Sequence, residues 1–255
     1  MRDILVIAIV LIGALAALRR PWIGIMLWTW LSIMNPHRYT WGIAYDAPLA
    51  AVAALSVVLG LLMTKERESP FKASPVIWFA IFMLWMTLSW LAGLDPAGDY
   101  EQWKKVMKID VMLLVALMLL HTKQHIFALM WVCVASLALL GAKGGVFSLL
   151  GGGGQRVWGP AGSFIEDNNA FAVALIMTIP LLRFLQLQLG NGWARHGMTG
   201  VIVLCAVGAL GSQSRGALLA IPAMAFLFMV ERQEQTRHGI IDFDDRGPVD
   251  CFHAR

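Results

Sequence analysis

Long stretches without a charged residue recur along almost the whole chain, and they constrain its fold more than any other feature. The runs cover residues 4–18, 21–37, 47–64, 73–94, 111–122, 124–142, 168–182, 196–214 and 216–230. A strand of a membrane barrel alternates apolar and polar residues, whereas these runs are continuous. Several are shorter than the roughly 20 residues of a perpendicular span, so flanking polar residues must complete them. The sequence predicts an all-α, polytopic membrane helix bundle with about nine transmembrane helices.

Composition supports the same class. The 255 residues are 58% hydrophobic and 14% charged, whereas about a quarter of a soluble domain is charged. The net charge of +4 fits membrane flanks and gives no indication of nucleic-acid binding. The three cysteines are widely separated and no metal-binding spacing occurs, so neither a metal nor a cofactor is expected. Membrane lipids are expected partners.

The chain changes character near residue 230. Residues 1–230 are expected to form the membrane domain, while ten of the last 25 residues are charged. Residues 231–255 are therefore expected to be a charged soluble or aberrant tail.

Alternating the spans from an outside N-terminus places residues 151–167 and Arg215 on one external face. The count of positive charges favours this orientation more if residues 98–108 lie flat on the membrane surface. Tyr100, Trp103 and Met107 would then share one helical face, and the neighbouring lysines would reach lipid phosphates.

The loop GGGGQRVWGPAGSFIEDNN, residues 151–169, has unusual backbone freedom and many polar groups. Gly151–Gly154 can take positive φ and let backbone N–H groups converge on an anion. Arg156 adds a permanent charge, and Trp158 offers a stacking surface or an interfacial anchor. The alternative is a flexible hairpin between two spans.

Acids and amides close this loop. Glu166 and Asp167 precede an apolar helix, with Asn168 and Asn169 as further candidates for its N-cap. One interpretation is a purely structural acidic cap. The other is a binding site for a polyanionic head group with a carboxylate beside it.

Two further cations lie within or beside apolar runs. Lys143 either snorkels from a helix end, which the glycines after it favour, or contributes to a site. Arg215 follows Gln213 and Ser214 in a turn between two spans, where it is an interfacial charge with a serine-rich cap or a phosphate ligand. Gly141 and Gly145 form a G-x-x-x-G pair that favours close helix packing.

Several long motifs carry a family resemblance. The N-terminal 42 residues, YEQWKKVMKI, the segment KGGVFSLLGGGGQRVWGPAGSFIEDNNAFA and SQSRGALLA occur in this order between residue 1 and about residue 230. Together they resemble the O-antigen ligase/polymerase-like family, in particular the O-glycosylation ligases associated with exosortase A systems. Relatives of this type continue past the Arg215 helix into further spans and a large periplasmic loop. By this resemblance the C-terminal part of the enzyme is expected to be missing here.

The resemblance implies a multi-pass glycosyltransferase of the bacterial inner membrane. Such enzymes transfer a glycan from undecaprenyl pyrophosphate to an acceptor lipid, protein or polysaccharide on the periplasmic face, without a nucleotide sugar. It implies that Arg215, within SQSRGA, contacts the pyrophosphate, with Arg156 as a second contact. Glu166 or Asp167 is the candidate for orienting or deprotonating the acceptor.

Two other functions remain open from the residues. The chain could be a transporter or flippase subunit for a lipid-linked sugar, which would place charged groups along a path through the membrane. It could also be a non-catalytic membrane remnant.

Overall fold

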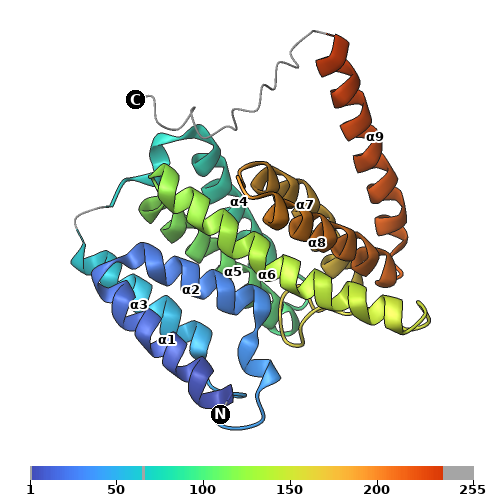
Figure 1. Ribbon diagram of the computed structural model, residues 1–255. Coiled ribbons are helices and arrows are strands. Elements are labelled where there is room, and N and C mark those ends of the chain that lie inside the picture. Colours follow the sequence, from blue (N-terminus) through green and yellow to red (C-terminus); the bar gives the residue numbers. More distant parts are fainter. Residues whose placement is uncertain (1, 65–66, 238–255) are drawn as a thin grey trace. The chain divides into compact units, whose positions relative to one another are not determined.

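The computed structural model describes residues 2–64 and 67–237. These residues form nine α-helices and two short 3-10 helices, η1 (Pro36–Tyr39) and η2 (Pro70–Lys72). The α-helices are α1 (Arg2–Arg19), α2 (Pro21–Met34), α3 (Leu49–Met63), α4 (Ser74–Leu91), α5 (Pro96–Leu119), α6 (Lys123–Leu150), α7 (Asn168–Leu187), α8 (Gly192–Gly211) and α9 (Arg215–Arg237) (Figure 1). No strand occurs in the described ranges, so the all-α prediction is confirmed.

The predicted count of nine transmembrane helices is not supported. Within the described residues, four helices are long and apolar enough to cross a membrane, namely α4, α6, α7 and α8. The helices α2 and α3 have 14 and 15 residues. At 1.5 Å per residue they extend about 22 Å, short of a hydrocarbon core of about 30 Å. In α5 the first half carries most of the charges, so its apolar part is short. Four apolar helices of this length indicate a membrane protein.

The chain divides into two compact units. Unit 1 comprises Met1–Leu31 and Thr40–Leu129, and unit 2 comprises Ser32–Tyr39 and Met130–Arg255. In unit 1, α1 and α3 lie side by side (Figure 1). Val10, Leu31 and Ala53 are fully buried in the cluster that joins them to α2.

The helices α4 and α5 of unit 1 pair as an antiparallel hairpin. The ring of Trp90 in α4 stacks on Trp103 of α5, with centroids 4.4 Å apart. The Trp103 Nε1 group donates to Thr87 Oγ1 at 3.4 Å, and Thr87 also contacts Met107. Residues 98–108 form the first half of the continuous helix α5 and not a helix of their own. Its aromatic face, with Tyr100, Trp103 and Met107, packs on α4.

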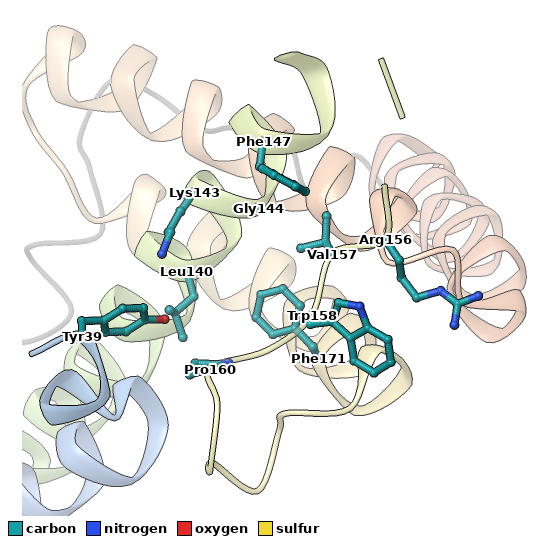
Figure 2. Close-up of a pocket in the computed structure, with 10 residues that line it drawn as sticks. All are labelled: Tyr39, Leu140, Lys143, Gly144, Phe147, Arg156, Val157, Trp158, Pro160 and Phe171. Carbon is teal, nitrogen blue, oxygen red and sulfur yellow. The ribbon is translucent and has the colours of Figure 1, made fainter. Parts of the chain in front are cut away.

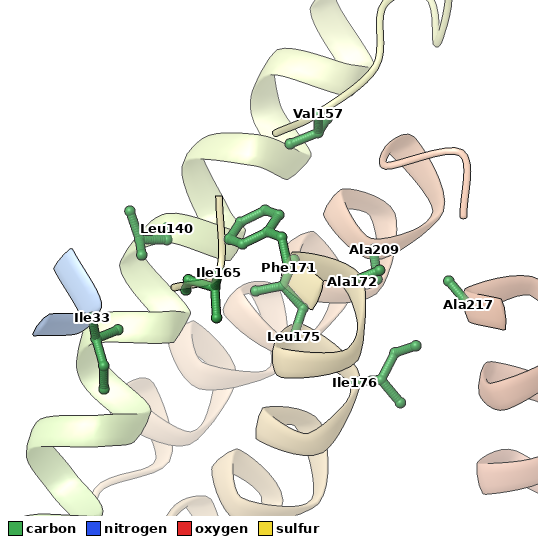
Figure 3. Packing of buried hydrophobic residues seen from close by; sticks show 10 residues of the cluster. All are labelled: Ile33, Leu140, Val157, Ile165, Phe171, Ala172, Leu175, Ile176, Ala209 and Ala217. Atoms are coloured by element: carbon green, nitrogen blue, oxygen red, sulfur yellow. The ribbon is translucent and has the colours of Figure 1, made fainter. Parts of the chain in front are cut away.

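Unit 2 is built on α6, α7 and α8. The last two are antiparallel neighbours (Figure 1). Figure 3 shows Phe171 of α7 among Leu140, Ile165 and Leu175 in the main apolar cluster. Phe171 and Leu175 are almost completely buried.

Glycines bring α6 and α8 into backbone contact. A Cβ added to Gly145 would collide with the carbonyl of Leu204, and one added to Gly208 would lie 2.9 Å from the carbonyl of Gly141. Gly141 also has no room for a Cβ beside Cys205. The prediction that Gly141 and Gly145 serve close packing is confirmed, because helices without side chains at the contact can approach this closely.

The change of composition at residue 231 is not a boundary of secondary structure. Helix α9 continues through it to Arg237. The rest of the charged tail, residues 238–255, lies outside the described residues.

The glycine contact predicts a large effect of one methyl group. We expect Gly145→Ala to lower the free energy of unfolding by about 1–3 kcal/mol, the usual cost of overpacking. The matched control is Gly200→Ala in α8, where an added Cβ meets nothing within 4 Å. That variant should be neutral or slightly more stable, because alanine favours helix over glycine. Thermal unfolding in detergent, followed by circular dichroism, compares them, and equal stability of the two variants would contradict the packing role.

Candidate functional site

A cavity of about 260 Å³ lies in unit 2 beside the loop between α6 and α7. It is lined by Tyr39, Leu140, Lys143, Gly144, Phe147, Arg156, Val157, Trp158, Pro160 and Phe171. Two of the lining residues, Gly144 and Val157, lie against each other at its wall. They can do so because Gly144 has no side chain: a Cβ there would lie 2.9 Å from Val157. Its volume is just below the range of about 300–1,000 Å³ that is usual for ligand pockets, so it has room for a small ligand or for part of a larger one.

The cavity combines two cations with two aromatic rings. Figure 2 shows Lys143 with Tyr39 at one side and Arg156 with Trp158 at the other. The Lys143 Nζ atom is 4.5 Å from the centroid of the Tyr39 ring, and the Arg156 Cζ atom is 5.9 Å from that of Trp158. Both distances fall within the range of cation–π attraction. No carboxylate is among the lining residues, so the charge of the cavity is positive.

The snorkelling interpretation placed Lys143 at a helix end. In the structure Lys143 lies within α6, about two turns before its end. Helix α6 continues through the glycines that follow to Leu150, because those glycines pack closely on other parts of unit 2. The lysine is nevertheless exposed, and its side chain turns to the cavity (Figure 2).

The segment before residue 40 contributes a side of the site that the sequence did not predict. Tyr39 ends the short helix η1, and the Asn35 Nδ2 group donates to Ala161 O at 3.1 Å. A Cβ on Gly162 would lie 3.4 Å from Arg38 Nε, so this arginine reaches the tip of the loop. Burial raises the pKa of the Tyr39 hydroxyl above its usual range. The motif NPHRY, with four polar side chains between apolar runs, was the available signal.

The four glycines do not form an anion site, which corrects the prediction for them. The N–H groups of Gly151, Gly152 and Gly153 donate to carbonyls in the last turn of α6, and that of Gly154 donates to Gly151 O. Gly152 and Gly153 have φ of 61° and 74°. This is a glycine C-cap. An anion would be disfavoured there, because a helix C-terminus carries partial negative charge.

The two carboxylates after the loop stabilise local structure. Glu166 Oε2 accepts a 2.8 Å hydrogen bond from Gly162 N. Asp167 is the N-cap of α7, and its Oδ2 accepts from the N–H groups of Asn169 and Ala170. Neither carboxylate lines the cavity. The structure therefore shows the predicted cap, and a catalytic role for either acid stays a prediction.

Three hydrogen bonds join the loop to the turn between α8 and α9. Val157 N donates to Gly211 O at 3.0 Å, and Gln213 Nε2 donates to Gly153 O at 3.3 Å. The third is from Asn168 Nδ2, at the start of α7, to Ser212 O at 2.9 Å. The loop of Arg156 and the turn preceding Arg215 thus lie at the same end of unit 2.

The remaining predicted residues lie in or beside this turn. Ser214 is buried, and its carbonyl accepts from two N–H groups in the first turn of α9. Arg215 begins α9, is exposed, and does not line the cavity. Its guanidinium has no hydrogen-bond or ion-pair partner among the described residues. Asn169 is exposed one residue beyond the buried Asn168.

Residues 1–189 match DUF5935, described as a family of unknown function. No curated protein and no solved structure matches the chain.

The buried bond between Asn168 and the turn leads to a matched pair of variants. We expect Asn168→Ala to lower the free energy of unfolding by about 1–3 kcal/mol, because the Ser212 carbonyl loses its buried side-chain donor. Asn169→Ala, one position on and exposed, should change it by less than about 0.5 kcal/mol. Thermal unfolding in detergent measures both. Similar values would show that the Asn168 bond does not hold the loop to the turn.

Proposed function

The chain belongs to the DUF5935 family, a family of unknown function, and we propose that it is a membrane glycosyltransferase of the ligase type. It would transfer a glycan from undecaprenyl pyrophosphate to an acceptor lipid, protein or polysaccharide. The proposal places the apolar helices in a bacterial inner membrane with the cavity facing the periplasm. Nine spans would require α1, α2, α3, α5 and α9 to cross as well, with their flanking polar residues.

The cavity with two cations and no carboxylate is the observation that supports this function most. In glycan transfer the leaving group is a lipid pyrophosphate, and fixed cations stabilise the charge that develops on it. Lys143 supplies a point charge, and Arg156 a planar guanidinium that can bind two phosphate oxygens. The cavity takes only the phosphate-bearing end of the donor, since the prenyl chain and a glycan exceed its volume of about 260 Å³.

The neighbouring groups have roles consistent with this chemistry. Trp158 is 57% exposed and offers a face to the sugar next to the phosphate. Arg215 provides a further cation at the same end of unit 2, in a turn whose geometry Gln213 and Ser214 maintain. The acceptor would be oriented or deprotonated by Glu166 or Asp167. Each has one carboxylate oxygen, Oε1 or Oδ1, that accepts no hydrogen bond from the described residues.

Binding of farnesyl pyrophosphate to the purified full chain in detergent tests the cavity. We expect Lys143→Ala and Arg156→Ala each to weaken binding by about tenfold or more, the cost of losing a hydrogen bond to a charged group. The matched control is Lys72→Ala, an exposed lysine of unit 1. Farnesol should bind the wild type and these variants equally. If both cavity variants bound farnesyl pyrophosphate as tightly as the wild type, the phosphate role would be wrong.

Glycan transfer tests the reaction itself. In a host that lacks its own ligase, a longer homologue carrying the equivalents of Lys143→Ala and Arg156→Ala should lose transfer about a hundredfold or more, as when a fixed charge stabiliser is removed. The unchanged homologue is the positive control, and the present chain is supplied in parallel. If the unchanged homologue binds farnesyl pyrophosphate but transfers no glycan, the ligase function is rejected and the anion site is retained.

Transport of a lipid-linked sugar is a second candidate, because unit 1 holds a buried carboxylate. Asp110 of α5 is 8% exposed, and its Oδ2 has no hydrogen-bond partner among the described residues. Buried acids in membrane helices commonly lie on transport paths. Sequence inspection missed Asp110 because it stands at the edge of an apolar run. Asp110→Asn should leave farnesyl pyrophosphate binding unchanged if unit 2 alone forms the site. Loss of movement of a labelled lipid-linked sugar across vesicles in this variant, but not in Lys143→Ala, would favour transport.

A further inference from the structure

The contacts between α4 and α5 show which residues of the two helices lie at the same level. Trp90 Nε1 donates to Pro96 O at 2.8 Å, and the Trp90 ring contacts those of Tyr100 and Trp103. Further along α5, Met107 lies beside Thr87. The start of α5 is therefore level with the end of α4, and α5 runs back along α4 from there.

This register places the lysines of α5 at the edge of the membrane. Helix α4 is a candidate span that ends at Leu91, and its aromatic end resembles the tryptophan and tyrosine belts of membrane interfaces. Trp103 is level with Thr87, four residues and about 6 Å before that end. Lys104, Lys105 and Lys108 are thus level with the last turns of α4, where long side chains extend to the head groups.

The three lysines differ in how they are engaged. Lys104 Nζ is 3.2 Å from Glu101 Oε1 and 5.4 Å from the centroid of the Tyr100 ring. Lys105 and Lys108 are exposed, and neither has a hydrogen-bond or ion-pair partner among the described residues. They are spaced i, i+3, so they share one face of α5.

We propose that Lys105 and Lys108 bind the phosphate of an anionic phospholipid at the membrane edge. Two neighbouring ammonium groups at head-group level complement a lipid phosphate with net negative charge. The Trp90–Trp103 stack holds α5 against α4 and so keeps the two lysines at this level. The site belongs to unit 1 and is independent of the function proposed for the cavity of unit 2.

Lipid retention tests the site with the full chain. The protein is reconstituted with equal amounts of phosphatidylglycerol and phosphatidylcholine and extracted in mild detergent, and bound lipids are counted by native mass spectrometry. We expect the wild type to retain phosphatidylglycerol preferentially. In Lys105→Gln/Lys108→Gln the preference should fall by about ten- to thirtyfold, the size expected for two lysines at an anionic lipid surface.

Two matched variants separate charge from structure. Lys104→Gln removes the lysine already paired with Glu101 and should keep most of the preference, while Lys105→Arg/Lys108→Arg should keep all of it. The unfolding temperature in a zwitterionic detergent, equal for all variants, shows that the fold is unaffected. The site is rejected if the wild type has no lipid preference. It is also rejected if Lys105→Gln/Lys108→Gln keeps the preference for phosphatidylglycerol. The same holds if Lys104→Gln lowers that preference as much as the double variant does.

Discussion

At one end of unit 2, the positions of the α6–α7 loop and the α8–α9 turn depend on hydrogen bonds to backbone polar groups. These groups need partners from the protein because neither a bilayer nor an apolar core supplies water to them. Four helices end or begin there, and each leaves N–H or C=O groups without partners inside the helix. The loop satisfies two of them, because Gly151–Gly153 donate to the last carbonyls of α6 and Asp167 accepts from the first N–H groups of α7. In the turn after α8, the Ser214 carbonyl accepts from N–H groups in the first turn of α9. The bonds of Val157 and Asn168 to the turn after α8 then place this loop. The cavity is enclosed by the segments that these bonds hold.

The same requirement explains why glycine and acidic residues in the loop were open to two interpretations. A glycine run can bind an anion or cap a helix, and the choice depends on whether a helix ends beside it. Here α6 continues past Lys143 to Leu150, so the glycines meet its final carbonyls. The positive charge of the site comes instead from side chains, and one of these, Lys143, lies within the helix whose end the glycines cap.

Apolar runs predicted the helical class well, because continuous hydrophobicity is a property of each segment alone. They did not predict the number of candidate spans, since α2 and α3 are as apolar as those four helices but shorter. Within the site, the position of Asp167 next to an apolar run was enough to predict its N-cap. The approach of Tyr39 to Lys143 could not be predicted, because it joins segments about a hundred residues apart and depends on tertiary packing. For residues 98–108 the periodicity identified the correct face, but only the position of Trp90 shows that this face meets another helix.

Helix α6 has 28 residues, which at 1.5 Å per residue extend about 42 Å, against a hydrocarbon core of about 30 Å. A helix of this length that crosses a bilayer has to tilt or to project by about two turns, and bilayer thickness sets how far. Lys143 lies about two turns before the end of α6, within the length that tilt or projection must accommodate. The depth of the cavity relative to the head groups is therefore coupled to membrane thickness. For an α6 that crosses the bilayer, a thicker membrane would place Lys143 deeper, where less water screens its charge.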